Sequence, residues 1–206
     1  MKTSNSSKRW LKEHFADVYV KKAHQQGLRS RAYFKLEELD QKEHLFKKGM
    51  TICDLGAAPG GWSQYLAQKL SGQIQIFALD ILPMEPLSGV DFLCGDFTED
   101  SVLECLSQKL VVRQVDAVIS DMAPNFSGHK KVDVLKSMYL AELALDFALS
   151  MLKPGGFFLV KLFQGEGFDL YLKNIRTRFQ QVKILKPLAS RDRSREVYLL
   201  AKGFKL

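Results

Sequence analysis

A glycine-rich turn that follows an apolar strand constrains this chain more than any other feature. Residues 51–63 read Thr-Ile-Cys-Asp-Leu-Gly-Ala-Ala-Pro-Gly-Gly-Trp-Ser, so an apolar run passes through Asp54 into the turn and then into a helix. Glycine reaches backbone conformations closed to other residues and carries no side chain to hold a neighbour away. We therefore expect a ligand to lie against the bare backbone of Gly56, Gly60 and Gly61.

Two common nucleotide-binding patterns fail in this turn. A phosphate-binding loop needs a lysine directly before its Ser or Thr, and Trp62 stands in that position although Gly56, Gly61 and Ser63 fit the spacing. The dinucleotide pattern fails because Ala58 replaces its second glycine. The acidic residues around the turn instead suit a cationic ligand that carries adenosine. S-adenosylmethionine fits that description.

The length and composition of the chain predict a single α/β domain. With 206 residues, 46% of them hydrophobic, the chain can bury one core but is short for two. The three cysteines have no C-x-x-C or histidine spacing suited to zinc, so we expect no disulfides, no metal and a reducing, cytoplasmic location. No apolar run approaches the roughly 20 residues that span a bilayer. The first ten residues lack the apolar stretch of a secretion signal.

Alternating helix and strand patterns predict a mostly parallel sheet with helices on both faces. We expect helices near 9–24, 30–42, 62–70, 100–110, 134–152 and 168–179, and strands near 51–54, 74–80, 91–93, 115–120, 157–161, 182–187 and 196–201. Ligands bind beyond the carboxyl ends of the strands in such sheets. Four carboxylates fall at or just after strand ends and should meet at that edge: Asp54, Asp80, Asp96 and Asp121.

Three of these carboxylates have an expected role in holding the cofactor. Asp80 would accept hydrogen bonds from a ribose diol, as acids after the second strand do in nucleotide-binding folds. Asp96 would accept the adenine amino group, and Asp54 would hold the turn or the ammonium of the cofactor. The alternative for any one of them is a structural cap on a helix or turn.

The distribution of charge predicts a polyanionic partner. Residues 1–35 hold nine Lys or Arg against two acids, residues 36–170 eleven against nineteen, and residues 171–206 ten against two. Basic ends around an acidic centre could form one face that binds nucleic acid. The alternative is a solvated basic surface.

Several segments carry a strong resemblance to a known family. They are Arg-Ser-Arg-Ala-Tyr-Phe-Lys-Leu at 29–36, residues 54–63, Ser-Asp-Met-Ala-Pro-Asn at 120–125, Gly-Gly-Phe at 155–157 ahead of Val-Lys at 160–161, Phe-Gln-Gly-Glu-Gly at 163–167, and Ser-Arg-Glu-Val-Tyr at 194–198. Together they resemble the FtsJ-type ribosomal RNA ribose 2′-O-methyltransferases from about residue 9 to the end. The resemblance implies a seven-stranded, Rossmann-like class I fold that binds S-adenosylmethionine. In the bacterial members most similar to this sequence, the implied substrate is a uridine of 23S rRNA in the large ribosomal subunit.

The resemblance also assigns site residues. Matched motif by motif, a Lys-Asp-Lys-Glu tetrad that acts on a ribose hydroxyl falls on Lys35, Asp121, Lys161 and Glu196. Gly60, Trp62, Asp80 and Asp96 match cofactor contacts of the family. With the turn and the strand ends, the expected cofactor-binding set is Asp54, Gly56, Ala58, Pro59, Gly60, Gly61, Trp62, Asp80, Asp96 and Asp121.

Lys161 is the central candidate in the tetrad. A ribose hydroxyl is a poor nucleophile and needs a base, or a group that orients its lone pair. An apolar run leads directly into Lys161, and lysines are almost never fully buried without a partner. We expect Asp121 to orient Lys161 and the hydroxyl, and Lys35 and Glu196 to complete the network. The alternative is a set of surface ion pairs.

The chain ends are expected to bind RNA. We predict a flexible basic tail at 1–8, a helical RNA-binding extension at 9–50 and a methyltransferase core at 51–206, in a monomer. The candidate RNA-binding residues are Lys8, Arg9, Lys12, Lys21, Lys22, Arg29, Arg31, Lys35, Arg191, Arg193 and Arg195.

Four other classes of protein remain to be weighed. A base-directed amino methyltransferase usually has a [D/N/S]-P-P-[Y/F] stretch, and the segment 121–125 lacks it. A metal-dependent small-molecule methyltransferase would not need the basic ends. The broken dinucleotide pattern disfavours a nicotinamide oxidoreductase. A non-catalytic RNA-binding assembly factor is the main alternative, although all four tetrad residue types are present.

Overall fold

A computed structural model of the protein describes residues 17–110, 114–125, 127–191 and 194–205. Within these ranges the helices are α2 (Val18–Gln25), α3 (Ala32–Glu43), α4 (Gly61–Lys69), α5 (Asp100–Leu110), α6 (Lys130–Met151) and α7 (Phe168–Arg178). The strands are β1 (Thr51–Leu55), β2 (Gln75–Asp80), β3 (Val90–Cys94), β4 (Val115–Ser120), β5 (Leu152–Phe163), β6 (Phe179–Leu185) and β7 (Glu196–Phe204).

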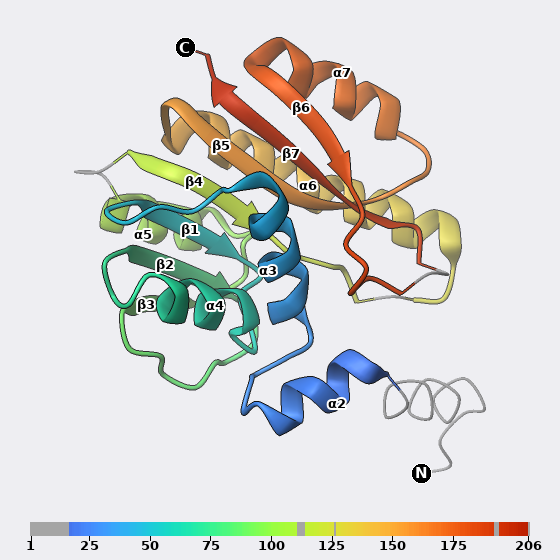
Figure 1. Cartoon of the computed structure of the whole chain (residues 1–206). Coiled ribbons are helices and arrows are strands. Elements are labelled where there is room, and N and C mark those ends of the chain that lie inside the picture. The colour runs from blue at the N-terminus through green and yellow to red at the C-terminus, as the bar shows by residue number, and fades with distance from the viewer. Residues whose placement is uncertain (1–16, 111–113, 126, 192–193, 206) are drawn as a thin grey trace.

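The strands form one seven-stranded sheet in the order β3-β2-β1-β4-β5-β7-β6 (Figure 1). The neighbours from β3 to β5 pair in parallel, whereas β7 is antiparallel to both β5 and β6. The predicted mostly parallel sheet is confirmed. Chain order reverses between β1 and β4, and ligands bind at the carboxyl ends of strands beside such a reversal.

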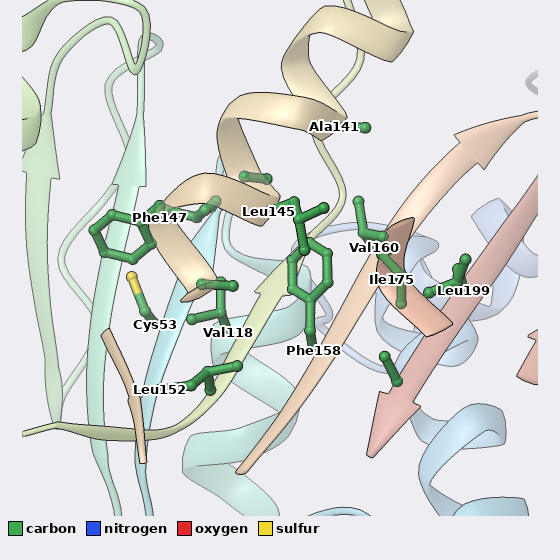
Figure 2. Packing of buried hydrophobic residues seen from close by; sticks show 14 of the residues in the cluster. Cys53, Val118, Ala141, Leu145, Phe147, Leu152, Phe158, Val160, Ile175 and Leu199 are labelled. Carbon is green, nitrogen blue, oxygen red and sulfur yellow. The ribbon is translucent and has the colours of Figure 1, made fainter. Parts of the chain in front are cut away.

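Strand alternation divides the core between the two faces of the sheet, because successive side chains on a strand point to opposite sides. Phe158 and Val160 of β5 face α6 and α7 together with Val118 of β4 (Figure 2). Phe157 and Leu159 face the other way, into a cluster that includes side chains of α3 and α4. Both faces are therefore covered by helices, as the alternating pattern predicts.

Several element boundaries differ from the sequence prediction. Strand β6 spans Phe179–Leu185 rather than 182–187, and β7 extends to Phe204 rather than 201. Helix α6 begins at Lys130 rather than 134, and β5 begins at Leu152 rather than 157. Gly155 and Gly156 do not stop a helix ahead of the strand, because Leu152 already pairs with Val115 and the register then shifts before Phe157 pairs with Ala117. The first part of the helix predicted at 9–24 lies outside the described residues.

Phe158 provides a test of this core. Its ring is fully buried between the sheet and α6. We expect Phe158→Ala to lower the free energy of unfolding by about 3–5 kcal/mol, because the truncation leaves a cavity. Leu170→Ala, at a side chain that is 74% exposed on α7, should change it by less than about 0.5 kcal/mol. Denaturant titration of both variants measures the difference, and equal losses would contradict the arrangement.

Candidate active site

Strand alternation places the predicted tetrad on the α3 face of the sheet. Lys161 continues the row of Phe157 and Leu159 along β5, and Asp121 directly follows β4. Antiparallel pairing then sets Tyr198 of β7 opposite Lys161 and Glu196 opposite Phe163. The start of β7 therefore lies at the carboxyl end of β5.

The four tetrad side chains come together in one hydrogen-bonded network. The Nζ atom of Lys161 lies 3.0 Å from Oδ1 of Asp121 and also donates to the backbone oxygen of Asp121. The Nζ atom of Lys35, on α3, lies 2.6 Å from Oε1 of Glu196. The structure thus brings together two ammonium and two carboxylate groups from α3, β5, β7 and the end of β4.

A tyrosine that was not predicted as a site residue joins the two ion pairs. The hydroxyl of Tyr198 donates to Oδ1 of Asp121 at 2.8 Å and accepts from Nζ of Lys35 at 3.1 Å. It also lies 3.3 Å from Oε1 of Glu196. The signal for this residue is present in the sequence, since Tyr198 stands two positions after Glu196 on a strand and therefore shares its face.

The network holds its charges at fixed positions in a mostly buried setting. The Lys161 side chain is 7% exposed and that of Asp121 is 17% exposed. Burial alone would raise the pKa of Asp121, but the ammonium groups of Lys161 and Lys35 and the hydroxyl of Tyr198 hold it below the ordinary value. Burial, with the nearby Asp121 and Glu196, raises the pKa of Tyr198 well above its ordinary value. Asp121 is therefore an anion and Tyr198 a neutral donor at neutral pH.

A cleft of about 690 Å³ adjoins the network at the carboxyl ends of β1, β2 and β4. Its volume suits a small organic ligand. Half of the ten expected cofactor contacts line it, namely Gly56, Ala58, Asp80, Asp96 and Asp121. Asp54, Pro59, Gly60, Gly61 and Trp62 are not among its lining residues, so their contact with a cofactor stays a prediction.

Asp80 and Asp96 are organised by neighbouring backbone groups. Asp80 accepts the backbone N–H groups of Ala58 at 2.9 Å and Leu82 at 2.8 Å. Asp96 accepts both the backbone N–H and the hydroxyl of Thr98, and these hydrogen bonds lower the pKa of Asp96. Both carboxylates therefore cap turns, which is the alternative role stated for them above, and both also line the cleft.

Asp54 is fully buried behind the turn. Its Oδ2 accepts the Ser63 hydroxyl at 2.7 Å, and Oδ1 has no hydrogen-bond partner among the described residues. Burial raises the pKa of Asp54 to about 7, and the carboxylates of Asp121 and Asp80 add to this effect against the opposing Ser63 hydrogen bond. Asp54 is thus a buried carboxyl whose pKa lies near neutrality, close to the carboxyl groups of Asp121 and Asp80.

Protein segments, rather than open space, lie against the glycines of the turn. A Cβ atom on Gly56 would meet Cγ of Met122 at 2.6 Å, and one on Gly61 would meet Oγ of Ser30 at 2.3 Å. The bare backbone therefore also serves packing against the segments after β4 and before α3. Trp62 is likewise buried, and its indole N–H donates to the backbone oxygen of Ala32 at 2.9 Å.

Arg29 fastens the N-terminal extension to the same turn. Its guanidinium donates to the backbone oxygens of Glu85 and Pro86 at 2.7 Å each, and to that of Pro59 at 3.4 Å. A Cβ atom on Gly60 would meet Nη1 of Arg29 at 2.7 Å. Arg29 thus has internal partners in addition to its predicted role in RNA binding.

The other predicted RNA-binding residues fall into distinct settings. Arg31 is paired with Asp17 and donates to the backbone oxygen of Ala189, and Nε of Arg191 lies 3.6 Å from the same Asp17 carboxylate. Lys35 belongs to the tetrad. Lys21, Lys22 and Arg195 are exposed. The candidates Lys8, Arg9, Lys12 and Arg193 lie outside the described residues.

No helix among the described residues is long and apolar enough to cross a membrane. No group of three or more His, Cys, Asp or Glu side chains in the same ranges is placed to hold a metal ion.

The sheet order, the antiparallel β7 and the carboxylate-lined cleft define a Rossmann-like methyltransferase domain. Comparison with known proteins agrees, because residues 28–204 match the FtsJ-like methyltransferase family. The chain belongs to the FtsJ-like methyltransferase family, and it is an enzyme of that class.

Individual relatives support the same placement. The chain is 57% identical to the Ribosomal RNA large subunit methyltransferase E of Legionella pneumophila (strain Corby), over the full length of both. It is 31% identical to a crystal structure assigned as a ribosomal RNA methyltransferase from Plasmodium falciparum, with a TM-score of 0.77 over 85% of this chain and 98% of that one. A fibrillarin/Nop5p complex, with 18% identity, a TM-score of 0.56 and 82% and 81% coverage, shares the fold.

Tyr198→Phe tests the bridge between the ion pairs. Loss of the hydroxyl removes hydrogen bonds to Asp121 and Lys35, so we expect methyl transfer to fall about tenfold to a hundredfold while the chain stays folded. Tyr171→Phe is the matched control, because it removes a buried hydroxyl that donates to Ala141 on α6. Steady-state rates and thermal unfolding separate the two, and full activity in Tyr198→Phe would contradict the assignment.

Asp54→Asn tests the buried carboxyl. The unfolded chain releases this proton near pH 4 and the folded protein near pH 7, so the stability that Asp54 contributes is lost as pH rises between these values. Relative to wild type, we expect the variant to gain roughly 3 kcal/mol between pH 5 and pH 8. Unfolding free energies of the cofactor-free proteins measure this gain. A gain no larger than that of the exposed control Asp91→Asn would contradict the interpretation.

Proposed function

We propose that this enzyme transfers a methyl group from S-adenosylmethionine to the ribose 2′-hydroxyl of a uridine in 23S rRNA of the large ribosomal subunit. One observation carries the proposal: Asp121 lines the cleft and also bonds to Lys161 and Tyr198. Asp121 thus belongs both to the cleft expected to bind the methyl donor and to the tetrad network expected to bind the substrate hydroxyl. The relative from L. pneumophila, named as a large-subunit rRNA methyltransferase, supports the substrate class.

The residues of the cleft fit the cofactor. Asp80, Asp96 and Asp121 supply negative charge for a cationic, adenosine-bearing molecule, and Leu79 and Met122 supply apolar wall. The cofactor, when bound, supplies a methyl group on a positively charged sulfur. Asp80 would hold the ribose hydroxyls, and Asp96 the adenine amino group.

The network is suited to orient a weak nucleophile. Asp121 fixes the Lys161 ammonium through two contacts, so one remaining N–H direction can be aimed at the substrate hydroxyl. Lys161 would then orient the hydroxyl oxygen for attack on the methyl group, and Asp121 would hold Lys161 in place. The methyl–sulfur bond of the cofactor would break as the oxygen–methyl bond forms, and the hydroxyl proton would pass to water. Lys35 and Glu196, which pair directly and are joined to Asp121 through Tyr198, hold the ribose at the edge of the site.

The basic surface is proposed to bring RNA to this site. Two exposed lysines, Lys21 and Lys22, lie on α2 in the N-terminal extension. Arg195 is also exposed and lies next to Glu196, at the start of β7. We propose the division into a tail at 1–8, an RNA-binding extension at 9–50 and a core at 51–206. We also propose that the enzyme acts as a cytoplasmic monomer.

Labelled methyl transfer tests the function directly. We expect wild type to transfer label from S-adenosylmethionine to unmethylated large subunits or naked rRNA, with the label on a uridine 2′-oxygen. Lys161→Ala should lose transfer by at least about a hundredfold and still bind the cofactor. Lys153→Ala is the control, because it removes the partner of Asp116 from the other end of β5. RNA binding without transfer by wild type would favour the non-catalytic assembly factor.

Salt dependence tests the RNA surface. We expect Lys21→Ala combined with Arg195→Ala to weaken RNA binding and to reduce the slope of log affinity against log salt by about 1.5, if each contacts one phosphate. Lys109→Ala, which breaks an exposed pair with Asp91, should leave both unchanged. Titrations between low and physiological salt provide the slopes. An unchanged slope in the double variant would contradict RNA contact at these positions.

A further inference from the structure

The loop between β6 and β7 presents one large apolar side chain to solvent beside the tetrad. Leu188 is 79% exposed, although Ala189 is fully buried and Ser190 is 4% exposed. The backbone N–H of Ser190 donates to the oxygen of Pro187 at 2.9 Å, which closes a tight turn with Leu188 at its first corner. Turn corners more often carry Gly, Pro, Asn, Asp or Ser.

This turn is held rigidly. The carboxylate of Glu38, on α3, accepts the backbone N–H of Leu188 at 2.8 Å and that of Ala189 at 3.3 Å. Arg31 donates to the backbone oxygen of Ala189. The position of Leu188 is therefore fixed by groups of the N-terminal extension, and its exposure is not that of a loose loop.

The turn is also joined directly to the catalytic network. The Ser190 hydroxyl donates to Oε1 of Glu196 at 3.0 Å, on the same oxygen that pairs with Lys35. Arg191 directly follows Ser190 and Arg195 precedes Glu196, so two cationic residues come shortly after the exposed leucine in the sequence. An apolar side chain close in the sequence to cationic residues suits a nucleotide, whose base has an apolar face and whose phosphate is anionic.

We propose that Leu188 packs against an unpaired base of the RNA substrate and so positions its strand over the tetrad. This inference rests on the proposed function. A paired base is stacked within its helix and has no free face for the side chain, so the contact selects single-stranded or opened RNA. Specificity for the target region would then come in part from the turn at residues 187–190.

Three variants test the contact: Leu188→Ala, Leu188→Phe and the control Leu170→Ala, which truncates an equally exposed leucine on α7. We expect Leu188→Ala to lower kcat/KM for unmethylated large subunits about tenfold, through loss of apolar contact with the base. Leu188→Phe should stay within about twofold of wild type, because a ring also stacks on a base. Leu170→Ala should equal wild type. The dissociation constant of S-adenosylhomocysteine, the demethylated product, should be the same in all four proteins.

The outcomes separate this inference from the function on which it rests. If wild type transfers methyl groups to rRNA and Leu188→Ala matches it within about twofold, the inference is wrong and the function stands. If Leu188→Ala weakens S-adenosylhomocysteine binding as much as RNA methylation, the residue acts through the fold and the inference is also wrong. If wild type transfers no methyl group to rRNA, the proposed function itself fails.

Discussion

The antiparallel register of β7 against β5 is the constraint on which the site depends. Parallel strands bring only their carboxyl ends to the edge where ligands bind. Because β7 runs the other way between β5 and β6, it brings its first residues there, so that Glu196 lies opposite Phe163 and Tyr198 opposite Lys161. A shift of one residue would turn Glu196 and Tyr198 to the opposite face of the sheet. The core contacts of β7 and the hydrogen-bonded tetrad are therefore set by the same pairing.

That register places equal numbers of positive and negative groups in a mostly buried site. Two ammoniums and two carboxylates balance, and Tyr198 passes a hydrogen bond from the Lys35 pair to Asp121. Paired charges can be kept in such a site, whereas an isolated one would be neutralised. Asp54 shows the contrast, since burial raises its pKa to about 7 and the neighbouring carboxyl groups of Asp121 and Asp80 add to that effect. The Asp121 carboxylate could interact favourably with a cationic ligand bound in the cleft.

The sequence predicts the sheet because apolar runs are short-range patterns, whereas the full tetrad, with Lys35 and Glu196, is predicted only through the family resemblance. Apolar runs locate the strands, and strand ends locate Asp121 and Lys161. The partners of the glycine turn could not be predicted, since Arg29 reaches it across a gap of about 30 residues that only tertiary packing closes. Tyr198 could have been predicted as a site residue, because it stands two positions after Glu196 and both therefore lie on one face of the strand. Its role as a bridge, however, required the position of α3.

The most direct test of the central claim is a structure of the enzyme with S-adenosylhomocysteine and a fragment of the rRNA substrate. We expect the cofactor sulfur in the cleft lined by Asp80 and Asp121, and one ribose 2′-oxygen about 3 Å from Nζ of Lys161, on the side facing the sulfur. A base nitrogen in that position, or a cofactor bound away from Asp121, would contradict the assignment of ribose methylation to this network.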